Sequence, residues 1–244
     1  RYNLNRNWYY DYIHDNSIGG NYNFSSNLAA WWRLDKNISS EGNLEDSSNN
    51  SHTMTAAASA NRPSFDTNDT PSTVIQASSC LFATNDFLTA VDTNTLSFGN
   101  TYYDKPFSIS FWLKPTTLDG AEENQGIVSK WHTTGDNAEY LVYIKSENIR
   151  FDLYSQGNSG INASVRTTSN ILSAGNWVHI VCTYDGRGGG TAGNGMSIYV
   201  NGVLPASTAS TDGGYVAMSN TTAPVALGNI ASGENATDLN GNLA

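Results

Sequence analysis

The chain of 244 residues carries a formal net charge of −10, and only 14% of its residues are charged. A negative chain repels phosphate backbones, which argues against a nucleic-acid partner. No apolar run reaches the roughly 20 residues of a membrane-spanning helix, so membrane insertion is not expected either. The length suits one large all-β domain. The acidity would suit a bound cation such as Ca²⁺, or it serves solubility alone.

Residues 1–26 are rich in Tyr and Asn and show no hydrophobic period. They form either a docking arm or an irregular start to the fold, and the domain proper is predicted over 27–244. The first strand-like run covers 28–34. Two weaker strand candidates follow at 79–88 and 89–98.

From residue 107 onward the strand signal becomes strong. Phe107–Phe111 alternates apolar and polar residues, which is the mark of a half-buried strand, and the run stops at Pro115. Turn residues separate the further predicted strands, which cover 126–131, 140–144, 149–154, 177–184, 196–200 and 225–227. Asn201–Gly202 predicts a tight hairpin into Val203–Leu204, because both turn positions tolerate positive φ. Strands at this spacing, with no amphipathic helix, predict a sandwich or a barrel.

The two cysteines do not make a disulfide framework. Cys182 lies in an apolar run, which favours a buried free thiol, and a Cys80–Cys182 bridge is the alternative. The Gly-rich segment 186–195 lacks the Lys-Ser/Thr of a phosphate-binding loop and is interpreted as a hairpin connection.

The carboxylates of the sequence do not form a catalytic pattern. Glycosidases need two carboxylates that flank the scissile bond. Asp152 stands alone between Phe151 and Leu153, and no Gly-x-Ser-x-Gly nucleophile motif occurs. The sequence therefore predicts a protein that is not an enzyme.

Aromatic residues outside the predicted core are the remaining binding candidates. Tyr102, Tyr103 and Tyr215 lie in predicted loops, and tyrosine rings stack on sugar faces. Tryptophans on strands are assigned first to the core. Trp131 and His132 are nevertheless candidates for lining a ligand groove, with a plain surface loop as the alternative for His132.

Four segments occur in a characteristic order: FSISFWLKP (107–115), GIVSKW (126–131), NWVHIVCTYDG (176–186) and MSIYVNGVLP (196–205). With the opening LAAWWRLD and DSSNNSHTMT (28–55), they resemble the laminin-G-like and pentraxin-like domains of the concanavalin A superfamily. The resemblance runs from about residue 28 to residue 244. It implies an all-β jelly-roll sandwich of two antiparallel sheets, and binding to glycans or proteins, often with calcium.

The family's sequence pattern continues into one more strand, whereas this sequence stops within the pattern at Asn240–Ala244. The resemblance thus implies a sandwich that lacks its last strand. That strand would come from sequence outside these residues or from another chain, and its absence would leave an open sheet edge.

The resemblance also implies calcium ligands. Asp136 and Asn137 match an Asp-Asn pair that pentraxins carry between the same two strands, and Glu139 follows closely. Pentraxins supply further ligands from an acidic loop after Leu-Gly. Here the matching loop is less acidic, and Glu234 and Asp238 are its contributors.

A second calcium candidate is the loop with Asp46 and Asn49, which matches the family's DSSGN loop. For both loops the alternative is a turn stabilised by its own hydrogen bonds.

Two functions are consistent with these features. The first is a non-catalytic binding module of a larger surface or particle protein that recognises glycan or protein ligands, with calcium as its cofactor. The alternative is a structural module that decorates a virion or another assembly beside neighbouring subunits, with no soluble ligand. Both place the protein outside the cell or on a virion surface.

Overall fold

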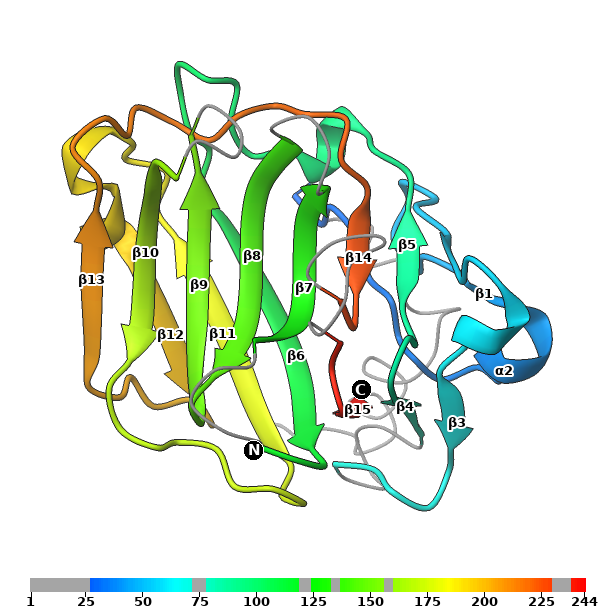
Figure 1. Cartoon of the computed structure of the whole chain (residues 1–244). Coiled ribbons are helices and arrows are strands. Elements are labelled where there is room, and N and C mark those ends of the chain that lie inside the picture. Colours follow the sequence, from blue (N-terminus) through cyan, green and yellow to red (C-terminus); the bar gives the residue numbers. More distant parts are fainter. Residues whose placement is uncertain (1–26, 72–77, 119–123, 133–136, 156–159, 230–237) are drawn as a thin grey trace, which may run out of the picture.

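The computed structural model describes residues 27–71, 78–118, 124–132, 137–155, 160–229 and 238–244. Two antiparallel sheets lie face to face and form a sandwich (Figure 1). The predicted all-β, two-sheet architecture is therefore confirmed. The predicted arm over 1–26 lies outside the described residues.

Within the described residues, the larger sheet has nine strands in the order β1-β2-β5-β14-β7-β8-β9-β10-β13. Their bounds are β1 Asn43–Leu44, β2 Met54–Thr55, β5 Leu88–Ala90, β7 Gln125–His132, β8 Asn137–Lys145, β9 Asn148–Tyr154, β10 Asn162–Thr167, β13 Ser207–Thr211 and β14 Val225–Leu227.

The smaller sheet has six strands among the same residues, in the order β12-β11-β6-β15-β4-β3. Their bounds are β3 Ser64–Asp66, β4 Ser79–Phe82, β6 Phe107–Pro115, β11 Val178–Tyr184, β12 Met196–Val200 and β15 Gly241–Leu243. The helical turns are α2 Ile38–Glu41, η2 Ser59–Asn61, η3 Asn94–Leu96 and η4 Gly189–Gly195. No helix in the described part of the chain has the length and apolarity to cross a bilayer.

Hydrophobic alternation explains how the sheets face each other. On β11, Val178, Ile180, Cys182 and Tyr184 point inward and are buried, while the residues between them are partly exposed. This period of two gives each strand one core face. In contrast, β8 is buried on both faces from Ala138 to Ile144.

The aromatic centre of the core is the ring of Phe107. It stacks on Phe98 with ring centroids 4.3 Å apart and meets Tyr140, Phe151 and Tyr184 at 5.5, 5.7 and 6.2 Å. These rings come from both sheets and from the segment after η3. Edge and offset contacts of this kind are favourable beyond the burial of their area.

Both cysteines are buried and unbridged, so the predicted free thiol at Cys182 is confirmed. Burial raises the pKa of the Cys80 thiol to about 12 and raises that of Cys182 as well. Neither sulfur is therefore a reactive thiolate near neutral pH.

The strand predicted over residues 28–34 does not form. The segment makes a single bridge, between Trp32 and Asp46. Its backbone bonds go to one loop instead, because the Trp31 N–H donates to the Asp46 carboxylate and the Trp31 carbonyl accepts from Ser47. A strand-like apolar run alone does not supply a pairing partner.

The hairpin predicted at Asn201–Gly202 is wrong in its second strand. Both residues take positive φ, 50° and 78°, and the turn closes between Val200 and Val203. The chain then crosses to the other sheet, where β13 pairs with β10. The Gly-rich connection before β12 also carries the 3₁₀ turns of η4.

Candidate functional site

A short loop, residues 99–104, projects from one end of the sandwich and is the green loop at the top of Figure 1. A bridge between Gly99 and Asp104 closes it. The Asn100 side-chain oxygen accepts hydrogen bonds from the N–H groups of Tyr102 and Tyr103, at 3.1 and 2.7 Å. This is the local turn that Asn commonly stabilises.

The two tyrosines of this loop point into solvent. Tyr102 is 75% exposed and Tyr103 is 76% exposed. Both predicted positions therefore offer aromatic surface to a ligand. The backbone beneath them is fixed, because the Thr101 N–H donates to the Met218 carbonyl at 2.8 Å. The loop thus presents two rings from an ordered base.

The carboxylate of Asp104 ties this loop to the rest of the sandwich. It accepts from the Tyr184 hydroxyl at 2.7 Å, the Tyr215 hydroxyl at 3.0 Å and the Met218 N–H at 2.7 Å. Burial raises the pKa of Asp104 above its usual value, and these hydrogen bonds offset part of that rise. Three donors from two distant segments therefore meet at one side chain.

Close packing also limits what the base of the loop can contain. A Cβ added at Gly99 would collide with the carbonyl oxygen and Cβ of Met218. Only glycine lets the two backbones approach this closely. The loop and the segment around Met218 consequently hold each other in place.

Tyr215 was predicted to contact ligand, and the structure corrects that assignment. Its side chain is 3% exposed, and its hydroxyl is bonded to Asp104. A ligand cannot reach it in this conformation. Tyr215 instead supports the loop that carries Tyr102 and Tyr103.

Trp131 and His132 lie at the end of β7. The Trp131 ring packs edge-on against Tyr154, with centroids 4.8 Å apart. It belongs to a small apolar cluster with Leu141 and Tyr143 on the outer face of the larger sheet. A ligand-binding role for Trp131 and His132 stays a prediction.

The same outer face carries the carboxylate of Asp152. It accepts from the hydroxyls of Tyr143 and Tyr154 at 3.0 and 3.4 Å, and the residue is only 8% exposed. Burial raises the pKa of Asp152 to about 6, against the lowering effects of Tyr143 and Arg150. A carboxylate closed in by two phenols is a structural group in this conformation.

Glu139 was predicted as a calcium ligand, and its position contradicts that role. Its side chain is fully buried, and Oε1 lies 2.9 Å from Lys130 Nζ. The same ammonium contacts Asp92 Oδ1 at 2.6 Å and the carbonyl oxygens of Ala223 and Thr221 at 2.8 and 3.3 Å. The chain's own cation therefore occupies this oxygen-rich pocket.

The Asp46 loop is satisfied by its own hydrogen bonds. One carboxylate oxygen accepts from the N–H groups of Trp31 and Ser48, and the other from the Ser48 hydroxyl and the His52 N–H. Burial alone would raise the pKa of Asp46, but these bonds outweigh it and lower that pKa. Asn49 is exposed beside it. The turn alternative fits this loop better than a calcium site.

The other predicted calcium ligands do not assemble a site among the described residues. Asp136 and Glu234 lie outside those residues, and Asn137 begins β8. Asp238 accepts a hydrogen bond from the Asn229 amide at 2.6 Å. Within the ranges that the structure describes, no three His, Cys, Asp or Glu side chains converge.

Residues 82–244 match the family described as the concanavalin A-like lectin/glucanases superfamily. Because the match spans more than half of the sequence, the chain belongs to this family, as the sequence motifs implied. No curated protein matches the sequence.

Two solved structures resemble the sandwich. The botulinum neurotoxin serotype G binding domain is 20% identical with a TM-score of 0.52, over 82% of this chain and 43% of that one. The binding domain of Paraclostridial Mosquitocidal Protein 1 is 14% identical with a TM-score of 0.52, over 88% of this chain and 46% of that one. The chain thus spans less than half the length of either structure. At such identities the likeness is one of fold.

Proposed function

We propose that this chain is a non-catalytic binding module that recognises glycans through Tyr102 and Tyr103, outside the cell. The observation that carries the proposal is the pair of exposed rings on a loop held by Asp104. Sugar rings offer flat faces of C–H groups that pack on aromatic faces. The family and the binding domains of similar fold agree with such a role.

The arrangement suits recognition because its ordering cost is low. Tyrosine supplies a large, rigid contact area with few rotatable bonds. A loop already fixed by hydrogen bonds loses little further entropy on binding. If each tyrosine ring contributes about 2 kcal/mol of binding free energy by packing on a sugar, the two together correspond to a dissociation constant of about 1 mM.

A glycan array tests the proposal, with the wild type compared with the double variant Tyr102→Ala, Tyr103→Ala. We expect the wild type to bind a subset of glycans and the double variant to lose that signal. The matched control is Val203→Ala, another exposed apolar residue. The turn that contains Val203 bonds to His179 at the start of β11. The tyrosine loop is held instead through Tyr184 at the other end of β11, so the control should leave that loop in place. No glycan signal, or equal loss in the control, would contradict the proposal.

Calcium dependence of this binding is a separate proposal, which rests on Asp136, Asn137 and Glu234. If these residues hold calcium, 1:1 calcium binding should raise the melting temperature by mass action. Melting is measured in CaCl₂ and in EGTA, for the wild type and for Asp136→Asn. A rise that disappears in the variant supports the calcium site, and identical melting in both buffers counts against it.

A further inference from the structure

The side chain of Lys130 is fully buried and contacts two carboxylates at once. Its Nζ lies 2.6 Å from Asp92 Oδ1 and 2.9 Å from Glu139 Oε1. The side chains of Lys130 and Glu139 are 0% exposed, whereas that of Asp92 is 26% exposed. Burying charges is costly even when they are paired. This cluster buries an amine and one more acid than a simple ion pair requires.

The larger sheet brings these three side chains together through its strand order. Lys130 lies on β7, and β14 separates it from β5, where Ala90 is the last residue. Asp92 follows Ala90 by two positions. Glu139 lies on β8 beside Tyr140, which is the residue paired with Lys130. The meeting of amine and acids is therefore fixed by the register of the sheet.

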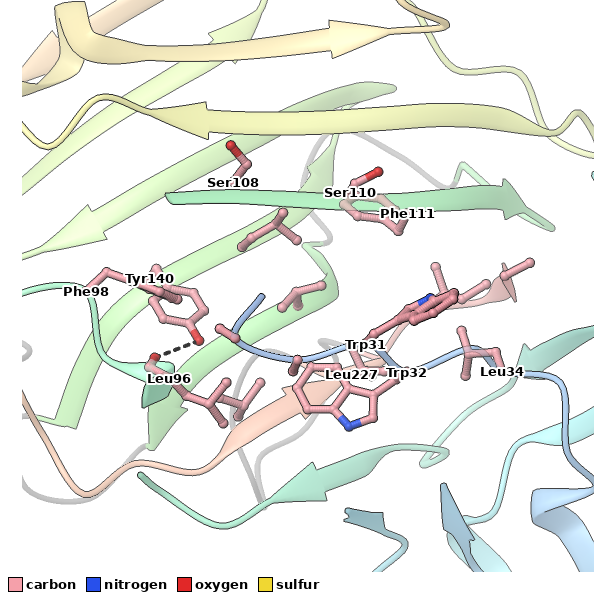
Figure 2. A pocket seen from close by; sticks show the side chains of 17 residues that line it. Trp31, Trp32, Leu34, Leu96, Phe98, Ser108, Ser110, Phe111, Tyr140 and Leu227 are labelled. Carbon is pink, nitrogen blue, oxygen red and sulfur yellow. Dashed lines mark hydrogen bonds between the residues drawn. The ribbon is translucent and has the colours of Figure 1, made fainter. Parts of the chain in front are cut away.

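Hydrogen bonds to the backbone hold the cluster in place. The Tyr140 hydroxyl donates to the Leu96 carbonyl at 3.1 Å, the dashed line in Figure 2, and so ties β8 to the segment that follows Asp92. The Thr221 N–H donates to Glu139 Oε1 at 2.7 Å. Both acids thus belong to segments with fixed positions, as the approach of reacting groups requires.

Glu139 has the properties of a group that moves protons. Among the described residues, its second oxygen, Oε2, is buried and has no hydrogen-bond partner. Burial raises the pKa of Glu139, and Lys130 counters part of that rise. A carboxylate in this setting can take a proton from the neighbouring amine and pass it on, which is general base and then general acid chemistry.

The distance between the amine and the Asp92 carboxyl suits bond formation. The carbon Cγ lies about 1.2 Å from Oδ1, so Lys130 Nζ lies within about 4 Å of the carbon that it would attack. Reacting atoms in a near-attack arrangement are about 3–3.5 Å apart. Because Asp92 is partly exposed, a water molecule formed at its carboxyl has a way out.

We propose that Lys130 and Asp92 condense into an intramolecular isopeptide bond, with Glu139 as the proton carrier. Two of the three Nζ protons pass by way of Glu139 to one carboxyl oxygen of Asp92. Nζ bonds to Cγ, the bond from Cγ to that oxygen breaks, and one water leaves. The charges of amine and acid disappear together, and Glu139 ends as it began. The ion pair is the state from which the bond forms.

The product fits the same surroundings. The amide N–H that remains on Lys130 has an acceptor in the Ala223 carbonyl, 2.8 Å from Nζ. The bond would join β7 to the segment after β5 across β14, and a cross-link of this kind restricts the unfolded chain. Hydrolysis needs water at a position that is fully buried, so the bond should persist. The proposal does not depend on glycan binding.

Mass spectrometry of the full chain, unfolded in acid, tests this inference. We expect the wild type to be lighter than its sequence mass by one water, about 18 Da. Tandem mass spectrometry of a digest should find one branched peptide that joins Asp92 to Lys130. Lys130→Arg keeps the cation but offers a guanidinium that is not a nucleophile, so this variant should have its full sequence mass.

The matched control is Lys114→Arg. Lys114 pairs with Asp69, and these side chains are 23% and 30% exposed, with no second carboxylate at the ammonium among the described residues. This variant should therefore keep the loss of one water. A wild type of full sequence mass would overturn the proposal, as would a water loss that persists in Lys130→Arg, because the dehydration would then lie elsewhere in the chain.

Two variants test the chemistry itself. Asp92→Asn carries an amide in place of the acid, so the same bond should release ammonia, and the loss should be about 17 Da. Glu139→Gln cannot take up the proton and should keep its full mass. If Glu139→Gln does not fold, the Asp92→Asn mass decides, and the absence of any loss there contradicts the bond. Unchanged water loss in Glu139→Gln would contradict the role of Glu139.

Discussion

At the scale of single residues, one carboxylate organises the end of the sandwich. Asp104 accepts bonds from Tyr184, Tyr215 and Met218. Asp104→Ala leaves these donors without a partner, and we expect the free energy of unfolding to fall by about 2–4 kcal/mol. Urea denaturation measures this loss.

The control for that prediction is Asp185→Ala. Asp185 pairs with Arg187, and both side chains are exposed, at 45% and 43%. Exposed pairs contribute roughly 0–1 kcal/mol, so this change should have a small effect. A loss in Asp104→Ala no larger than in Asp185→Ala would show that Asp104 does not hold the loop.

Asp152 gives the fold a defined pH dependence. Burial raises its pKa to about 6, so the folded chain binds this proton more tightly than the unfolded chain does. The stabilising contribution is complete below about pH 4, where both states are protonated, and it is lost as the pH rises through 6. Relative to Asp152→Asn, the wild type should lose on the order of 2 kcal/mol between pH 4 and pH 8.

Urea titrations of both proteins at several pH values measure this difference. The asparagine variant is a suitable reference because it resembles the neutral acid that Tyr143 and Tyr154 contact. A stability difference between the two proteins that does not change with pH would mean that Asp152 is not perturbed by burial.

Lys130 is the third residue with a measurable role. Burial raises the pKa of Glu139, and Lys130 counters this rise from 2.9 Å away. Lys130→Met leaves the carboxylate buried without its partner, which should cost about 3–5 kcal/mol. The double variant with Glu139→Gln should lose less than the sum of the two single losses, because the residues share one ion pair. Additive losses would contradict this coupling.

At the scale of elements, alternation predicted the strands that face the core. The predicted run Phe107–Pro115 is β6, and Met196–Val200 is β12, with the same bounds. In contrast, β13 is mostly polar, and its first four residues are exposed, so it carries no hydrophobic period to detect. The chain leaves the smaller sheet after β12, and β13 then pairs with β10 in the larger sheet. Local sequence does not specify this pairing.

The candidate site could be predicted only in part from the sequence. Tyr102 and Tyr103 could be placed in a loop because turn residues surround them. The burial of Tyr215 could not, since it depends on Asp104, which is 111 positions away in the sequence. Glu139 was likewise predicted to be a loop ligand. The sequence did not show that it lies in β8 and pairs with Lys130 on the neighbouring strand β7.

At the scale of the whole molecule, the core and the candidate binding surface lie in different places of the sandwich. The core lies between the sheets, and the tyrosine loop lies at one end (Figure 1). Loops on a rigid scaffold are where binding residues commonly lie. The fold alone does not name a ligand, so the proposed glycan binding rests on the exposed rings of Tyr102 and Tyr103.

The most direct measurement is isothermal titration calorimetry with the glycan that gives the strongest array signal. We predict measurable 1:1 binding to the wild type and to Val203→Ala, and at least a tenfold weaker affinity in the variant Tyr102→Ala, Tyr103→Ala. Equal affinity in all three proteins would contradict the assignment of the tyrosine loop as the binding surface.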